Sequence, residues 1–177
     1  TSASSNTSVG FAALGTNLTG ETNTAVGANA LNVALGNSNT AVGANAMVAT
    51  TTGTLNVAMG SSALASNVSG DHNVAIGTLS LATITTTDAN TAVGSYALNV
   101  NTAANNTAVG RSALTANTSG TENVAIGVTA GGSITTGSNN VNIGYDSNAS
   151  SQGNNNNTSV GSHTLQDNTG SNNTAIG

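Results

Sequence analysis

The residues of this chain that could do metal, acid–base or nucleophilic chemistry are few and scattered. His72 and His163 lie far apart in the chain and do not form a ligand set. The acidic residues are Glu21, Asp71, Asp88, Glu122, Asp146 and Asp167. Calcium requires about six to eight oxygen ligands, whereas no two acids lie closer than 17 residues apart in the chain. Serine and threonine are abundant, but no general base occurs at a fixed position beside them. The pattern predicts no enzyme, metal site or cofactor site, and we expect these residues to be solvated.

The composition excludes several classes of protein. The chain has 177 residues and a net charge of −5, and Arg111 is its only basic residue, so nucleic-acid binding is not expected. No apolar run approaches the roughly 20 residues of a membrane span, and no charged and apolar leader opens the chain. Low charge with much Asn, Ser, Thr and Gly is also found in disordered segments. Here, however, the apolar residues fall into regular columns.

These columns belong to a pentapeptide close to NTAVG, which recurs at a near-constant spacing and indicates a repeat architecture. Taking its Asn as position 0, the copies begin at Asn6, Asn23, Asn39, Asn56, Asn73, Asn90, Asn106, Asn123, Asn140, Asn157 and Asn173. Most copies open a 17-residue repeat. The 16-residue repeats begin at Asn23, Asn90 and Asn157, so a longer, four-repeat period is superimposed.

Each position of the repeat has its own chemistry. Position +1 is Thr or Val, +2 is mostly Ala, +3 is aliphatic or Met, and +4 is always Gly. This alternation predicts a strand, and the Gly predicts a turn with positive φ or a close backbone approach. A small residue at +7 and usually Leu at +8 predict the start of a second short strand. An antiparallel meander would need hairpin turns, but no Asn in the chain precedes Gly.

We therefore predict an all-β, parallel β-solenoid (β-roll) of about eleven coils, with residues 1–177 as one repeat domain roughly 50 Å long. We expect +1, +3 and +8 to fill the interior, and the Asn column to form a ladder of amides. The small residue at +2 would then face outward and admit a neighbouring chain. This favours a homotrimer over a monomeric two-sided roll.

The repeat also resembles a known family. The segment 106–122, NTAVGRSALTANTSGTE, is similar to repeats of bacteriophage tail fibres, and N-[TV]-A-[VI]-G resembles the YadA-like heads of trimeric autotransporter adhesins. The resemblance covers residues 6–177, although these coils are longer than those of the adhesin heads. We expect any stalk, membrane anchor or chaperone domain of the kind found in these families to lie outside residues 1–177. The resemblance implies a trimeric fibre shaft or adhesive head on a virion or cell surface, and it transfers no catalytic residue. Because the sequence stops at Gly177 in mid-coil with no polar cap, we expect it to be an uncapped segment of a longer fibre, continued end to end.

Recognition would have to come from positions that vary, and +5 and +6 vary most. They include Phe11, Tyr96, Arg111, Tyr145 and His163, which we expect to contact a host cell-surface glycan or receptor. A structural fibre shaft is the first hypothesis, and an adhesin head that binds a surface directly is the second. Ice binding is the third; it is weakened because the Thr column at +1 shares a face with +3 and should be buried.

Overall fold

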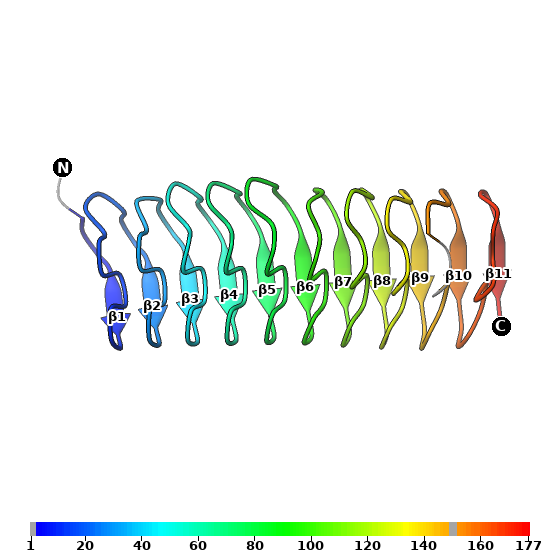
Figure 1. Cartoon of the computed structure of the whole chain (residues 1–177), viewed down its shortest axis with the longest axis horizontal. Helices are drawn as coiled ribbons and strands as arrows, with labels where there is room; N and C mark the ends of the chain where they lie inside the picture. The colour runs from blue at the N-terminus through cyan, green and yellow to red at the C-terminus, as the bar shows by residue number, and fades with distance from the viewer. Residues whose placement is uncertain (1–2, 149–151) are drawn as a thin grey trace.

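The pentapeptide forms one short strand in every coil, and the strands lie side by side along a rod (Figure 1). The computed structural model describes residues 3–148 and 152–177. The strands are β1 (Thr7–Val9), β2 (Thr24–Val26), β3 (Thr40–Val42), β4 (Val57–Met59), β5 (Val74–Ile76), β6 (Thr91–Val93), β7 (Thr107–Val109), β8 (Val124–Ile126), β9 (Val141–Ile143), β10 (Thr158–Val160) and β11 (Thr174–Ile176). They form one 11-stranded sheet in chain order. The predicted parallel β-solenoid is therefore confirmed.

Equivalent residues of successive coils pair with one another. Ala41 of β3 lies opposite Ala58 of β4, and Val42 lies opposite Met59. The same alignment holds at every step of the sheet, across the shorter coils as well as the longer ones. The extra residue of the longer coils is therefore accommodated in a turn.

The predicted orientation of the strand faces was wrong. The Ala at +2 is fully buried from β2 to β8, and the Asn at position 0 is fully buried from Asn23 to Asn157. The residues at +1 and +3 point away from the interior, and Met59 and Ile126 keep 43% and 42% of their surface exposed. We call the side chains at +1 and +3 the outer strand face.

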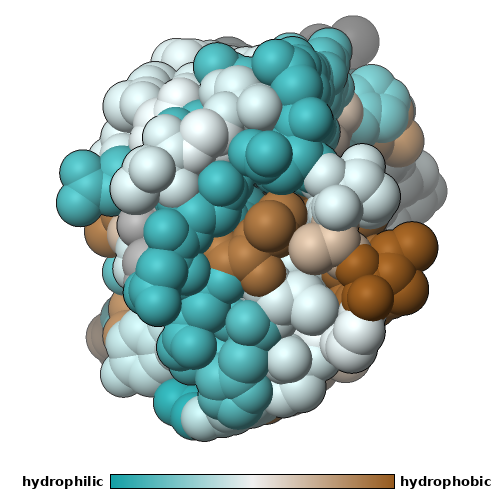
Figure 2. Space-filling model, turned by 90° about the vertical axis from the view of Figure 1, so that its right-hand side faces the viewer, coloured by the Kyte–Doolittle hydropathy of each residue, from teal (hydrophilic) through white to brown (hydrophobic). Residues whose placement is uncertain are grey.

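The narrow interior explains this reversal. The Leu at +8 is fully buried from Leu31 to Leu114, with Met47 in its place in one coil. Each buried Leu contributes about 1.5–3 kcal/mol, and the centre is then full. The facing strand has room only for Ala and for an amide with hydrogen-bond partners, because protein interiors are close-packed. Seen end-on in Figure 2, hydrophobic residues lie at the centre of the end face and most prominently again at its right-hand edge.

The predicted second strand at +7 and +8 does not occur in the described part of the chain. Turns follow each strand instead, and positions +6 and +8 take left-handed conformations, as in Tyr96 (φ 61°) and Leu98 (φ 49°). Position −1 is left-handed as well, as in His72 (φ 57°). A left-handed Leu costs roughly 1–2 kcal/mol, which burial of its side chain offsets. Left-handed residues at −1, +6 and +8 therefore help the chain to turn within each coil.

The predicted Asn ladder is confirmed, although most of its hydrogen bonds join side chains to the backbone. The N–H of Asn73 donates to Oδ1 of Asn56 at 2.9 Å. Nδ2 of Asn56 donates to the carbonyl of Gly70 at 2.8 Å and to Oδ1 of Asn39 at 3.1 Å. A buried amide without partners would cost about 1–3 kcal/mol. Stacking thus satisfies a polar column inside the rod.

The Gly at +4 ends each strand for both of the predicted reasons. Its φ lies between 126° and 136° from Gly10 to Gly161, a region that side-chain-bearing residues rarely adopt. A Cβ added to Gly60 would lie 2.7 Å from the carbonyl carbon of Gly77 in the next coil. Both the conformation and the stacking distance therefore require Gly.

One stretch of the interior is polar. Asn142 replaces the Ala at +2, and Gly131 and Asn148 replace the Leu at +8. Gly131 makes room for Asn142, because a Cβ at Gly131 would lie 3.1 Å from Nδ2 of Asn142. The amide atoms of both Asn142 and Asn148 are buried without a hydrogen-bond partner. Unpaired buried polar atoms are costly, so this stretch is less favourable than the apolar column that it replaces.

Candidate recognition ridge

Positions +5 and +6 form a continuous edge of the rod, which we call the ridge. They follow the Gly that ends each strand, and +6 is left-handed in every described coil from Ala12 (φ 54°) to His163 (φ 58°). The N–H at +6 donates to the carbonyl at +5 of the preceding coil, as from His163 to Tyr145 at 2.9 Å. These hydrogen bonds align the corners of successive coils.

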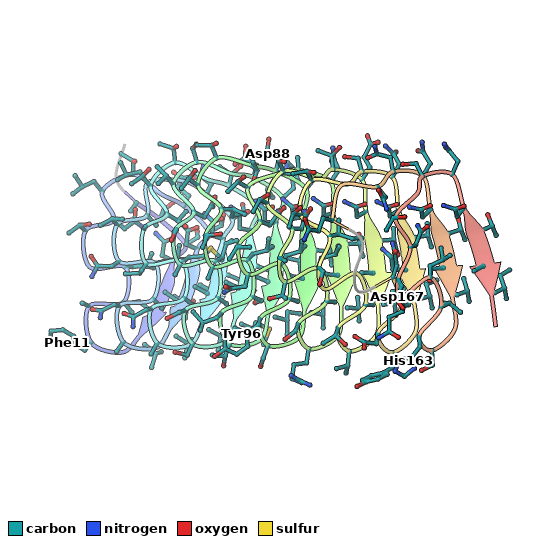
Figure 3. The ribbon with its side chains drawn as sticks, turned by 45° about the vertical axis from the view of Figure 1, so that its right-hand side comes forward. Phe11, Asp88, Tyr96, His163 and Asp167 are labelled. Carbon is teal, nitrogen blue, oxygen red and sulfur yellow. The ribbon has the colours of Figure 1, made fainter. Side chains whose placement is uncertain are left out.

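The five predicted recognition residues all lie exposed on the ridge. Figure 3 shows Phe11, Tyr96 and His163 along one edge of the rod, with Asp88 at the opposite edge. Among the described residues, only Tyr145 and His163 pair as aromatic rings, with centroids 5.1 Å apart and an interplanar angle of 70°. The structure therefore places the five residues on one line but brings only two of them together.

A polar cluster that the sequence did not predict lies beside Tyr145. Oδ1 of Asp146 accepts a hydrogen bond from Oγ1 of Thr129 at 2.9 Å, and its Oδ2 accepts one from Nε2 of Gln166 at 3.2 Å. The sequence suggested only a solvated charge at Asp146 and no role for Gln166. Gln166 occupies position +9, where Asn32 and Asn99 stand in the other 16-residue coils, and this recurrence could have revealed it.

The acids near the repeat boundary have a structural role that was also missed. Oδ1 of Asp71 accepts the N–H of Thr54 at 2.6 Å and its hydroxyl at 3.0 Å. Oδ1 of Asp88 accepts the N–H of Asp71 at 2.8 Å. In other coils the oxygen of an Asn does the same, as when Asn155 accepts the N–H of Ser138 at 2.7 Å. These carboxylates satisfy the backbone of the preceding coil.

The chemistry available on the ridge is therefore that of an open surface. No enclosed pocket, and no group of three or more His, Cys, Asp or Glu side chains, occurs in the parts of the chain that the structure describes. Those parts also contain no helix long and apolar enough to span a membrane. Exposed rings and nearby amides can contact an extended ligand but cannot enclose a small one.

No protein-family model, curated protein or solved structure matches this chain. Its function is therefore inferred from the residues and geometry of the rod itself.

Proposed function

We propose that this chain is a shaft segment of an extracellular fibre, such as a phage tail fibre or a related fibre, that supports attachment to a host or surface. The outer strand face carries this proposal. Position +3 is Val, Ile or Met in every coil, and each of these side chains is exposed or only half-buried. The resemblance of the repeat to trimeric fibre and adhesin repeats supports the same conclusion.

The outer strand face is about as large as the main apolar patch of a typical monomer. Three residues at about 3.3 Å and eleven strands at about 4.8 Å give an area of roughly 500 Å². The largest apolar patch of a typical monomer measures about 300–600 Å² and is often functional. A strip of this size that carries an aliphatic residue or Met in every coil is therefore a candidate interface.

Further copies of the same chain fit this strip best. A partner that covers identical apolar side chains at every coil must itself repeat about every 4.8 Å, and a parallel copy does so. Closed symmetry around a common axis would cover all copies equally, and the resembling families favour three. The small-residue face at 0 and +2 is interior, so the interface that we propose is the outer strand face.

Light scattering of the purified chain in solution tests this proposal. We expect a mass three times that of one chain, which is 16.9 kDa. The double substitution Val109→Lys and Ile126→Lys places charges on the outer strand face and should reduce the mass to that of one chain. The matched control, Thr86→Lys and Ser119→Lys, changes exposed residues elsewhere and should leave the trimer intact. A wild-type mass equal to that of one chain or of two chains would overturn the trimer.

An adhesin head that binds a surface directly is the second candidate, and the exposed rings of the ridge favour it. Binding of the purified oligomer to host cells would support it, whereas stable trimers that bind no cells would support a purely structural shaft.

Ice binding remains the third candidate. Contrary to our expectation, the Thr residues at +1 lie on the outer strand face, half-buried in Thr24, Thr40, Thr91 and Thr107. Val occupies the same position in β4, β5, β8 and β9, which interrupts the array of hydroxyls. A measurement of thermal hysteresis in solution decides this candidate.

A further inference from the structure

The aromatic residues of the ridge follow the four-repeat period, which is the interval from Asn23 to Asn90. Tyr96 and His163 are one such period apart, and Phe11 and Tyr145 are two periods apart. Phe11 and Tyr145 occupy position +5, whereas Tyr96 and His163 occupy position +6 of a 16-residue coil. Arg111 falls outside this spacing.

Backbone hydrogen bonds bring these positions together in pairs. The N–H of the +6 residue donates to the +5 carbonyl of the coil before it, which places +5 of one coil beside +6 of the next. The pairs, with their N···O distances, are Phe11 and Asn29 (2.8 Å), Thr78 and Tyr96 (3.0 Å), and Tyr145 and His163 (2.9 Å). We call each pair and its two coils a station. Every station carries at least one aromatic ring, and the stations are four coils apart.

Each station also holds one side-chain amide at +9 of its second coil. Nδ2 of Asn32 donates to the carbonyl of Ala12 at 3.1 Å, and Nδ2 of Asn99 donates to the carbonyl of Leu79 at 2.8 Å. Gln166 makes the equivalent contact with the Asp146 side chain. The remaining coils have Gly, Ala, Val or Thr at this position. The amides are thus tethered to the ridge through nitrogen, which leaves each amide oxygen to accept a hydrogen bond from a ligand.

The rings are open to solvent. The exposed fractions are 82% for Phe11, 46% for Tyr96 and 53% for Tyr145. At about 4.8 Å per coil, successive stations lie about 19 Å apart. One exposed ring binds little by itself, but several sites on one rod can hold a long ligand through avidity.

The chemistry of a station indicates the ligand. A ring face suits the apolar C–H face of a sugar, and an amide oxygen suits a hydroxyl. A net charge of −5 with one basic residue disfavours a polyanion. The absence of an enclosed pocket along the described ridge disfavours a peptide anchored by buried side chains.

We propose that the three stations bind one neutral polysaccharide chain lying along the ridge, with a sugar stacked on a ring at each station. This inference goes beyond the shaft role, which requires no ligand. It rests on the proposed fibre only in placing the chain outside the cell, where such polymers occur. Light scattering tests the fibre assembly separately, so the two proposals can fail independently.

Native electrophoresis through gels that contain soluble polysaccharide tests the proposal. The probes are dextran, yeast mannan, xyloglucan and laminarin as neutral polymers, and alginate as an acidic one. We expect at least one neutral polymer, but not alginate, to retard the protein. The triple substitution Phe11→Ala, Tyr96→Ala and Tyr145→Ala should weaken binding to that polymer about tenfold or more. Single substitutions should each weaken it less.

The matched control removes three exposed apolar side chains outside the ridge, by Leu18→Ala, Leu35→Ala and Leu55→Ala. It should be retarded like the wild type, and circular dichroism should show that both triple variants are folded. Fragments of the retained polymer too short to span about 19 Å should compete about tenfold less well than the full polymer. Absence of retardation by every neutral polymer, equal losses in the two triple variants, or retardation by alginate alone would overturn the proposal. The proposal would also be overturned if the ridge bound a host protein and none of the polysaccharides.

Discussion

Asn106 accepts the backbone N–H of Asn123 through its Oδ1 at 3.0 Å, which joins two coils inside the rod. The Nδ2 of the same amide donates to the carbonyl of Gly120 at 2.8 Å. One buried side chain therefore satisfies a donor at the start of the next coil and an acceptor near the end of its own coil. Because the pattern recurs along the rod, the stability of each coil depends on its neighbours.

Substitution Asn106→Ala should be strongly destabilising. It leaves the Asn123 N–H buried without a partner, at about 1–3 kcal/mol. It also removes one of the two hydrogen bonds to the Gly120 carbonyl, which keeps its bond from Nδ2 of Asn117. Urea unfolding followed by circular dichroism measures the change. Ser119→Ala, at an exposed position, serves as the control and should have little effect. A loss below about 0.5 kcal/mol for Asn106→Ala, which is typical of surface substitutions, would contradict the ladder.

Substitution Gly60→Ala should also destabilise the rod, by more than about 1 kcal/mol, because Ala is strained at this φ of 136° and its Cβ meets the Gly77 backbone. Gly170→Ala is the comparison: the nearest atom to its Cβ would be the Asn173 side-chain amide at 3.2 Å. Thermal unfolding should show a clear decrease in Tm for Gly60→Ala and a small change for Gly170→Ala. Equal decreases in Tm would show that the close approach of neighbouring backbones at +4 does not determine the effect of the substitution.

Restoring the common residues in the polar stretch should stabilise the protein. The double substitution Asn142→Ala and Asn148→Leu removes amides that have no hydrogen-bond partners and restores the common residue at two of the three altered positions. We expect a gain of about 1–3 kcal/mol in the free energy of unfolding, seen as a higher Tm. Asn117→Ala is the contrasting control, because Nδ2 of Asn117 donates to Gly120 at 2.9 Å, and it should lower the Tm. A double variant less stable than the wild type would mean that the two amides have partners in solution.

Removal of one whole coil should leave the fold intact. Deletion of residues 106–122 joins Asn105 to Asn123 and preserves the phase of every column. Deletion of residues 106–113 removes about half a coil and places unlike positions opposite one another. We expect the far-ultraviolet circular dichroism per residue to be unchanged in the first variant and largely lost in the second, because stability in such arrays is a sum over matched neighbours. Similar spectra for the two variants would contradict the requirement that equivalent positions of successive coils stack on one another.

Much of the fold could be predicted because equivalent positions of successive coils stack on one another, so that each position of the repeat keeps a residue type suited to its place. The spacing of the Asn residues gave the coil length, and their unvarying identity indicated the ladder. Gly at +4 indicated both the turn and the close approach. The variability of positions +5 and +6 also indicated that these residues are exposed along one edge of the rod. The four-repeat period was visible in the sequence, but its relation to the rings required the pairing of +5 with +6 across coils.

The sequence by itself determined the period, the parallel order and the alignment of the strands, because one residue type at one position must stack on its equivalent. Only the tertiary structure decided which strand face is interior. Alternation distinguishes two faces but does not say which one points inward; the width left by Leu98 and its equivalents does, and it admits Ala92 but not Val93. The structure likewise replaced the predicted second strand with left-handed corners, because closing so short a coil requires tight turns. Through that closure, Tyr145 and His163 meet on the ridge. The aliphatic residues at +3, which the sequence indicated as core, instead form the outer strand face of the rod.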